Sequence, residues 1–293
     1  MIDHAVNKAL QIIHERYSEH LTVASISEEI FVSPFYFSRA FQKVTGTPPS
    51  RYLKALRQFA AKRLLMTTSL TVSDVVAAVG YASVGTFSSR FLRETGMTPT
   101  QLRDPAVRDL FGAVGPGMRM MPSFELTAAA HRAQPPGARS AGAVTCTVSV
   151  PAGHAPADVI VGVFDTVVPQ GAPVACAAVR RTRSAEISLG SVPAGRWHLI
   201  ALAGDGSGGA DSGPHLLGVS RALCVRPGRL TAAELALRPP RLSDPPIATV
   251  FARPPSRLSA LIPAARAGDG PAGGGPWPAA PGPVWTDRVM SSR

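Results

Sequence analysis

The sequence lacks any apolar run long enough to cross a membrane, because none of its 293 residues fall in a stretch of about 18 consecutive apolar side chains. Its start, MIDHAVNKALQIIHERYSEHL, also lacks the basic-then-apolar order of a secretory signal. We therefore expect no membrane partner and a cytoplasmic location.

Cysteine is scarce, and its spacing excludes two common roles. Cys146, Cys176 and Cys224 lie far apart, match no Cys-x-x-Cys metal or redox motif, and are odd in number for a disulfide framework. We expect all three to be buried apolar thiols.

The chain also lacks motifs typical of catalysis. His154, His198 and His215 show no His-x-His or Glu-x-x-His spacing, and no serine sits in a Gly-x-Ser-x-Gly elbow. The sequence therefore predicts no catalytic residue, no metal ligand and no cofactor.

Lysine is absent after Lys62, although the net charge is +11 and the pI is about 10.5. A strongly basic chain favours a polyanionic partner. The lysine-free remainder is rich in Arg, Ala, Gly and Pro, which a GC-rich coding bias also produces. The charge thus supports nucleic-acid binding without establishing it.

Residues 1–104 carry apolar side chains at helical spacing, with clear start and stop signals. Thr22 and Ser33-Pro34 are typical of helix starts, and Gly46 of a left-handed C-terminal cap. A long helix is predicted from about Pro48 to Met66, roughly 28 Å in length.

The same pattern then repeats. Thr71 with Asp74 predicts a second capped start, Gly80 a turn and Ser83 another start, while Gly96 ends that helix and Thr98-Pro99 opens a short one. Two copies of a short helix, a tight turn and a second helix around one long linking helix predict an all-α double helix-turn-helix domain.

The remainder has a different character. Residues 105–142 predict a linker with a short helix near Val107–Phe111, and the Gly/Pro/Ala-rich residues 263–293 predict a disordered tail. Residues 143–262 alternate with period two, which predicts an all-β antiparallel sandwich-like domain for effector binding or dimerisation. Its expected strands are Val144–Val150, Val159–Asp165, Val174–Arg180, Glu186–Gly190, Arg196–Ala203, Leu216–Val225 and Ala233–Pro239.

The repeat resembles the DNA-binding domain of the AraC/XylS family of bacterial transcription regulators over about Leu21–Arg103. In the first copy the resemblance rests on Ser33-Pro34-x-Tyr36-Phe37-Ser38-Arg39-x-Phe41 with Thr45-Gly46. In the second copy it rests on Gly80-Tyr81-x-Ser83, Phe87-Ser88-x-x-Phe91, Thr95-Gly96-x-Thr98-Pro99 and Arg103. It implies binding to double-stranded DNA and regulation of transcription, with RNA polymerase as a further partner. The sign of regulation, activator or repressor, and the oligomeric state are left open.

The resemblance places particular residues against the DNA bases. The base-contacting positions it implies are Phe35, Ser38 and Arg39 in the first recognition helix, and Val84, Gly85, Ser88 and Ser89 in the second. Arg39 is suited to a two-bond contact with guanine, and Phe35 to a thymine methyl group. The second helix offers no such reader, so we expect its contribution to base discrimination to be smaller.

The phosphate-contacting positions implied in the same way are Ser33, Lys43, Arg51, Ser83, Thr86, Arg90 and Arg93. An alternative hypothesis is that the basic side chains are ordinary surface charges and hold no phosphate; this applies to Lys43, Arg51, Arg57 and Arg93. For Arg39 the alternative to base contact is a solvated surface arginine. One departure from the family concerns the first turn, where Phe31 replaces the usual glycine. A bulky residue at positive φ is strained, so we expect a distorted first turn or a weaker first module.

The family usually pairs its DNA-binding module with a second domain that senses a small molecule or dimerises, and the order here is the reverse of the commoner one. The segment Ile187–Leu199 resembles a strand, Pro-x-Gly turn, strand hairpin of prealbumin-like sandwiches. Three hypotheses remain: a regulator whose β domain binds an effector or partner, an accessory DNA binder whose β domain only oligomerises, and a DNA-bound enzyme.

Overall fold

The computed structural model describes residues 2–95, 97–104, 114–115, 119–120, 141–169, 171–204, 216–244 and 246. All of them belong to the first of two compact units, Met1–Arg253; the second, Pro254–Arg293, lies outside them. The predicted tail at 263–293 and most of the predicted linker at 105–142, including the helix near Val107–Phe111, also lie outside the described residues. No described helix is both long and apolar enough to cross a membrane.

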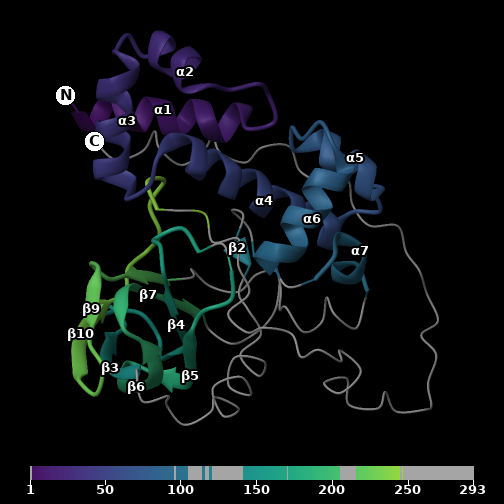
Figure 1. Ribbon diagram of the computed structural model, residues 1–293. Helices are drawn as coiled ribbons and strands as arrows, with labels where there is room; N and C mark the ends of the chain where they lie inside the picture. Colours follow the sequence, from purple (N-terminus) through teal and green to yellow (C-terminus); the bar gives the residue numbers. More distant parts are fainter. Residues whose placement is uncertain are drawn as a thin grey trace, which may run out of the picture. The chain divides into compact units, whose positions relative to one another are not determined.

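The N-terminal part is helical, as the sequence predicts. Its helices are α1 (Ile2–Arg16), α2 (Val23–Glu29), α3 (Pro34–Thr45), α4 (Pro49–Thr67), α5 (Val72–Ala78), α6 (Val84–Thr95) and α7 (Pro99–Leu102). Figure 1 shows the linking helix α4 between the group α1–α3 and the group α5–α7. We call α2 with α3 the first repeat, and α5 with α6 the second repeat.

The predicted caps fix where these helices begin and end. The Thr22 and Thr71 hydroxyls each accept a hydrogen bond from the backbone N–H three residues ahead, at Ser25 and Asp74. Ser33 caps α3 ahead of proline, and Gly46 ends it with φ of 76°. The capping residues at the helix ends therefore determine where these helices begin and end.

The two repeats match in their hydrogen bonds as well as in their helices. The buried hydroxyl oxygen of Thr45 lies 2.9 Å from the carbonyl oxygen of Phe41 and 3.0 Å from that of Thr47. The Thr95 hydroxyl oxygen repeats this, at 2.8 Å from the Phe91 carbonyl oxygen and 2.9 Å from that of Met97. The threonine of each copy thus has a structural role, because its hydroxyl satisfies carbonyl groups at the end of the recognition helix.

The turn inside each repeat is also the same, in spite of Phe31. The Phe31 and Gly80 amides each donate to the carbonyl three residues back, and the next amides, of Val32 and Tyr81, donate to the carbonyl five residues back. Phe31 has φ of 58° and Gly80 has φ of 78°. The predicted distortion of the first turn is therefore wrong, although Phe31 does adopt the strained left-handed conformation.

Replacing Phe31 with glycine is expected to stabilise the helical part by about 0.5–1 kcal/mol. The Phe31 side chain is 89% exposed, so its removal loses little burial. Relief of the positive-φ strain, about 1–2 kcal/mol, outweighs the added chain entropy of glycine. Thermal unfolding by circular dichroism measures the change. The control is Phe35→Gly, an exposed helical position where glycine should destabilise; a lower melting temperature for Phe31→Gly contradicts the assigned strain.

The second part of the chain is built from strands. Their bounds are β1 (Val114–Gly115), β2 (Arg119–Met120), β3 (Ala141–Ser149), β4 (Ala157–Phe164), β5 (Ala175–Thr182), β6 (Ser184–Pro193), β7 (Gly195–Gly204), β8 (Leu216–Val219), β9 (Leu223–Val225) and β10 (Leu230–Ala236). The strand predicted at 216–225 is in fact two, β8 and β9, which pair with different parts of β7. The other predicted strands are found with shifts of a few residues.

Among the described residues, the strands after β2 form two sheets of different make-up. The three-stranded sheet has the order β10-β3-β6, and the five-stranded sheet has the order β5-β4-β7-β8 with β9 on β7. The predicted antiparallel pairing is found for the other strand pairs of these sheets, but β10 runs parallel to β3. A parallel pair needs a crossover connection, which alternation along one strand does not reveal.

The predicted hairpin at Ile187–Leu199 is wrong for a related reason. β6 pairs with β3, whereas β7 pairs with β4, so the chain passes from one sheet to the other between them. Gly195, with φ of 150°, lies at this crossing. A Pro-x-Gly turn between two strands does not itself decide whether those strands pair.

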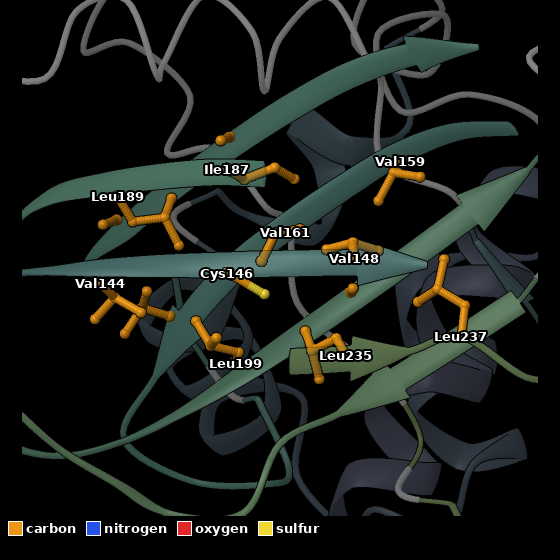
Figure 2. Packing of buried hydrophobic residues seen from close by; sticks show 14 of the residues in the cluster. Val144, Cys146, Val148, Val159, Val161, Ile187, Leu189, Leu199, Leu235 and Leu237 are labelled. Atoms are coloured by element: carbon orange, nitrogen blue, oxygen red, sulfur yellow. The ribbon is translucent and has the colours of Figure 1, made fainter. Parts of the chain in front are cut away.

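Side chains from both sheets form one hydrophobic cluster. It includes Val144, Cys146 and Val148 of β3 together with Val161 of β4 and Leu199 of β7, as Figure 2 shows. β4 is buried on both faces, because Ile160 and Phe164 join a second cluster with Ile200 of β7. This explains why β4 is continuously apolar from Val159 to Phe164, as expected for a strand covered on both sides.

The cysteines follow the prediction in part. Cys146 and Cys176 are buried and form no disulfide, and burial raises the pKa of each thiol to about 11. Cys224 is a free but exposed thiol, contrary to expectation, because it points away from the cluster that takes Val225. Among the described residues, no group of three or more His, Cys, Asp or Glu side chains comes together.

Candidate nucleic-acid interface

The first recognition helix, α3, is held by its aromatic face. Phe37 and Phe41 are buried, with ring centroids 5.5 Å apart, and Phe41 meets Tyr52 of α4 edge-on at 5.4 Å. Burial of these aromatic rings determines which side of α3 faces the protein interior. The opposite side of α3, which includes Phe35, therefore faces solvent.

The predicted base-contacting residues of α3 lie on this outward side. Phe35 is 72% exposed, Arg39 is exposed and Ser38 is half-buried. The Arg39 guanidinium carbon sits 5.4 Å from the centroid of the Phe35 ring, within the range of a cation–π contact. Arg39 and Phe35 are four residues apart, so the structure brings these two predicted residues together on one face.

The second recognition helix, α6, presents a less polar surface. Phe87 and Phe91 are fully buried and turn Val84, Gly85 and Ser89 outward, while Ser88 is half-buried. Neither an alkyl group nor a hydroxyl can make a two-bond contact with a base edge. The two recognition helices therefore offer different side chains on their exposed sides.

The predicted phosphate-contacting residues take several positions. Ser33 and Ser83 lie at the N-terminal ends of α3 and α6, where their hydroxyl oxygens accept from the amides of Tyr36 and Thr86, 3.3 Å away in each case. The N-terminal end of a helix carries partial positive charge and free amides, which suit a phosphate. The remaining predicted positions are exposed in the case of Lys43, Thr86 and Arg93, and half-buried in the case of Arg51.

Arg90 is already bound within the protein. Its Nε donates to Glu94 at 2.7 Å, and the second oxygen of Glu94 accepts from the Gln58 side-chain amide at 2.6 Å. Lys62 of α4 is 2% exposed, close to Glu94. Burial lowers the pKa of Lys62 to about 7, and the Glu94 carboxylate opposes this.

Sequence reasoning missed this polar network between α4 and α6. Gln58, Lys62 and Glu94 are all buried, although such residue types are seldom buried without partners. The available signal was spacing: Lys62 comes three residues after Phe59 and three before Leu65, in the buried stripe of α4. A polar group in an apolar stripe predicts a partner on the facing element.

Substituting Lys62 with methionine is expected to change how stability depends on pH. The pKa of Lys62 is about 7 in the folded chain and near 10.4 when unfolded, so between these values the unfolded chain binds more protons. Stability should therefore rise as pH increases from about 7 to 9, and Lys62→Met should remove that rise. Urea unfolding at several pH values measures it. Lys54→Met, at an exposed position on α4, is the control and should keep the rise.

Arg57 proves to be structural. Its Nε donates to the Tyr17 carbonyl at 2.6 Å and its Nη2 to the Glu19 carbonyl at 2.7 Å, just beyond the end of α1. Its guanidinium also lies 5.9 Å from the Tyr81 ring centroid. Arg57 therefore ties the first group of helices to the turn of the second repeat, contrary to the hypothesis of an ordinary surface charge.

Two helix-turn-helix units joined by one long helix, each with an outward recognition helix, define a tandem helix-turn-helix domain. A family model described as a helix-turn-helix domain matches residues 26–104. These residues are a helix-turn-helix domain, and they are similar to DNA-binding domains of the AraC type.

Curated relatives match the same part of the chain. An uncharacterized HTH-type transcriptional regulator, YobQ of Bacillus subtilis, is 34% identical over 34% of this chain and 42% of its own length. The bifunctional transcriptional activator/DNA repair enzyme AdaA of Bacillus subtilis is 31% identical over 33% of this chain and 46% of its own length. The chain thus spans less than half the length of these relatives.

Among solved structures, the domain is similar to a transcriptional regulator of Chromobacterium violaceum described as containing an AraC-type DNA-binding domain. That likeness has 29% identity and a TM-score of 0.33, and covers 34% of this chain and 90% of the other. The C-terminal domain of the response regulator yesN from Fusobacterium nucleatum matches at 33% identity, with a TM-score of 0.33, over 34% of this chain and 99% of the other.

Proposed function

We propose that this protein is a sequence-specific DNA-binding regulator of transcription that reads adjacent major-groove segments with α3 and α6. The observation that carries the proposal is the pair of outward recognition helices on a shared linking helix. α4 has 19 residues and is therefore about 28 Å long. This suits two helices that enter successive turns of the major groove, about 34 Å apart, on one face of the duplex.

Within this proposal, the outward residues divide the work. Arg39 and Ser38 of α3 read bases and Phe35 packs against a thymine methyl, while Val84, Gly85, Ser88 and Ser89 of α6 make smaller contacts. The helix ends at Ser33 and Ser83 and the nearby basic side chains hold phosphates. Arg90 takes part only through the nitrogens that Glu94 leaves open.

The β domain is proposed to be a sandwich-like unit that binds an effector or a partner and so regulates the DNA-binding domain. Support comes from its hydrophobic cluster, which both sheets share and which gives the domain a core of its own. A thermal-shift screen of the full-length protein against sugars and metabolites separates this role from oligomerisation alone. A ligand-dependent rise in melting temperature supports sensing, whereas a concentration-dependent dimer without any such rise supports the oligomerisation alternative.

Binding of the full-length protein to duplex DNA tests the proposal. The affinity for a selected duplex should fall steeply with salt, because each phosphate contact releases counterions, yet should resist competition from unrelated DNA. If unrelated competitor DNA displaces the selected duplex completely at every salt concentration, sequence-specific recognition is contradicted.

A further inference from the structure

We propose that Phe35 and Arg39 act together as a reader of a guanine that lies next to a pyrimidine carrying a C5 methyl group. The inference rests on the proposed DNA-binding function and adds the chemistry that the first recognition helix selects. The methyl group can belong to thymine or to 5-methylcytosine, since both present it at the same place in the major groove.

The side chains of Phe35 and Arg39 are in contact on the exposed side of α3. Phe35 is 72% exposed, and the Arg39 guanidinium carbon lies 5.4 Å from its ring centroid. Helical side chains lean toward the N-terminal end, so Arg39 reaches back over Phe35. The ring thus holds the guanidinium at the end of α3 that enters the groove in helix-turn-helix proteins.

The geometry of a guanine contact determines where Phe35 would lie against the DNA. A guanidinium that donates two hydrogen bonds to the O6 and N7 atoms of guanine lies close to the plane of that base. A group that contacts its face is then displaced toward the neighbouring base pair. At the neighbouring base pair, the apolar group exposed in the major groove is the C5 methyl of the pyrimidine. Phe35 is placed to cover this methyl group.

Neither side chain has another evident structural role. Phe35 does not belong to the buried core, which takes Phe37 and Phe41 from the same helix. Its exposure also means that truncation should leave the fold intact. The pair therefore offers DNA an apolar surface and a charged fork that are already positioned before binding, which reduces the ordering cost.

The test removes the methyl group alone. Full-length protein is measured against its selected duplex, and then against the same duplex with the thymine beside the guanine replaced by deoxyuridine. We expect an affinity loss of about three- to five-fold, the contribution of one buried methyl group. A duplex with 5-methylcytosine should bind tighter than one with cytosine at that position by a similar factor. Deoxyuridine placed opposite α6 is the control and should have a smaller effect.

Variants assign the effect to the two residues. Phe35→Ala should fold with an unchanged melting temperature and bind the thymine and deoxyuridine duplexes equally, and Phe35→Leu should retain part of the preference. Because the pair acts as a unit, Arg39→Ala should reduce the methyl preference as well as the guanine preference. Specific binding with equal affinity for thymine and deoxyuridine overturns this inference alone. Absence of any specific binding overturns the proposed function itself.

Discussion

Replacing Gly80 with alanine is expected to destabilise the helical part by about 3 kcal/mol or more. Gly80 has φ of 78°, which alone costs an alanine about 1–2 kcal/mol. An added Cβ would also lie 2.8 Å from the Ser18 carbonyl carbon and closer still to its oxygen. Both are backbone atoms, so the overlap requires the segment after α1 and the turn of the second repeat to move apart.

The control for this substitution is Gly85→Ala. Gly85 lies in α6, and apart from its chain neighbours and the helix's own backbone the nearest atom to an added Cβ is the Ser83 hydroxyl oxygen, at 4.0 Å. Alanine should therefore stabilise the helix by about 0.5–1 kcal/mol. Urea unfolding compares the two variants with the parent. Equal stability of the Gly80→Ala variant and the parent contradicts the close approach at Ser18.

The second large effect is expected from Arg39→Ala in the proposed DNA complex. Loss of a two-bond contact with guanine should reduce affinity for the preferred site by about 1–3 kcal/mol and relax the preference at one base pair. Because Arg39 is exposed, the melting temperature should not change.

Ser89→Ala is the matched control, since Ser89 is exposed at an outward position of α6. It should change affinity by a few tenths of a kcal/mol at most. Competition titrations with singly substituted duplexes measure both variants. An Arg39→Ala variant that binds every sequence equally weakly would assign Arg39 to the phosphates.

Local signals in the sequence predicted the helical part closely, because its boundaries depend on neighbouring residues. Ser33-Pro34 and Gly46 determine a helix by contacts within a few residues, and the repeat supplies each signal twice. The Phe31 turn shows the limit of such reasoning. The hydrogen bonds of the surrounding turn hold the backbone in place, so the strain stays local and does not distort the module.

The features that the sequence did not reveal depend on contacts between distant segments. The parallel pairing of β10 with β3 and the separation of β6 from β7 follow from how the sheets assemble, not from alternation along a strand. The bond between Gln58 and Glu94 joins residues 36 positions apart. Likewise, the sequence alone indicates a surface charge at Arg57, because its bonds to the carbonyls of Tyr17 and Glu19 join segments about 40 residues apart.

The central claim is that the two recognition helices read adjacent stretches of DNA with unequal precision. Selection of bound fragments from a random duplex library, with the full-length protein, tests it most directly. We predict enriched sequences with two half-sites about one helical turn, or 10–11 base pairs, apart. One half-site should contain a fixed guanine beside a thymine, and the other should be degenerate. Enrichment of no common sequence, or of two equally sharp half-sites, would contradict this account.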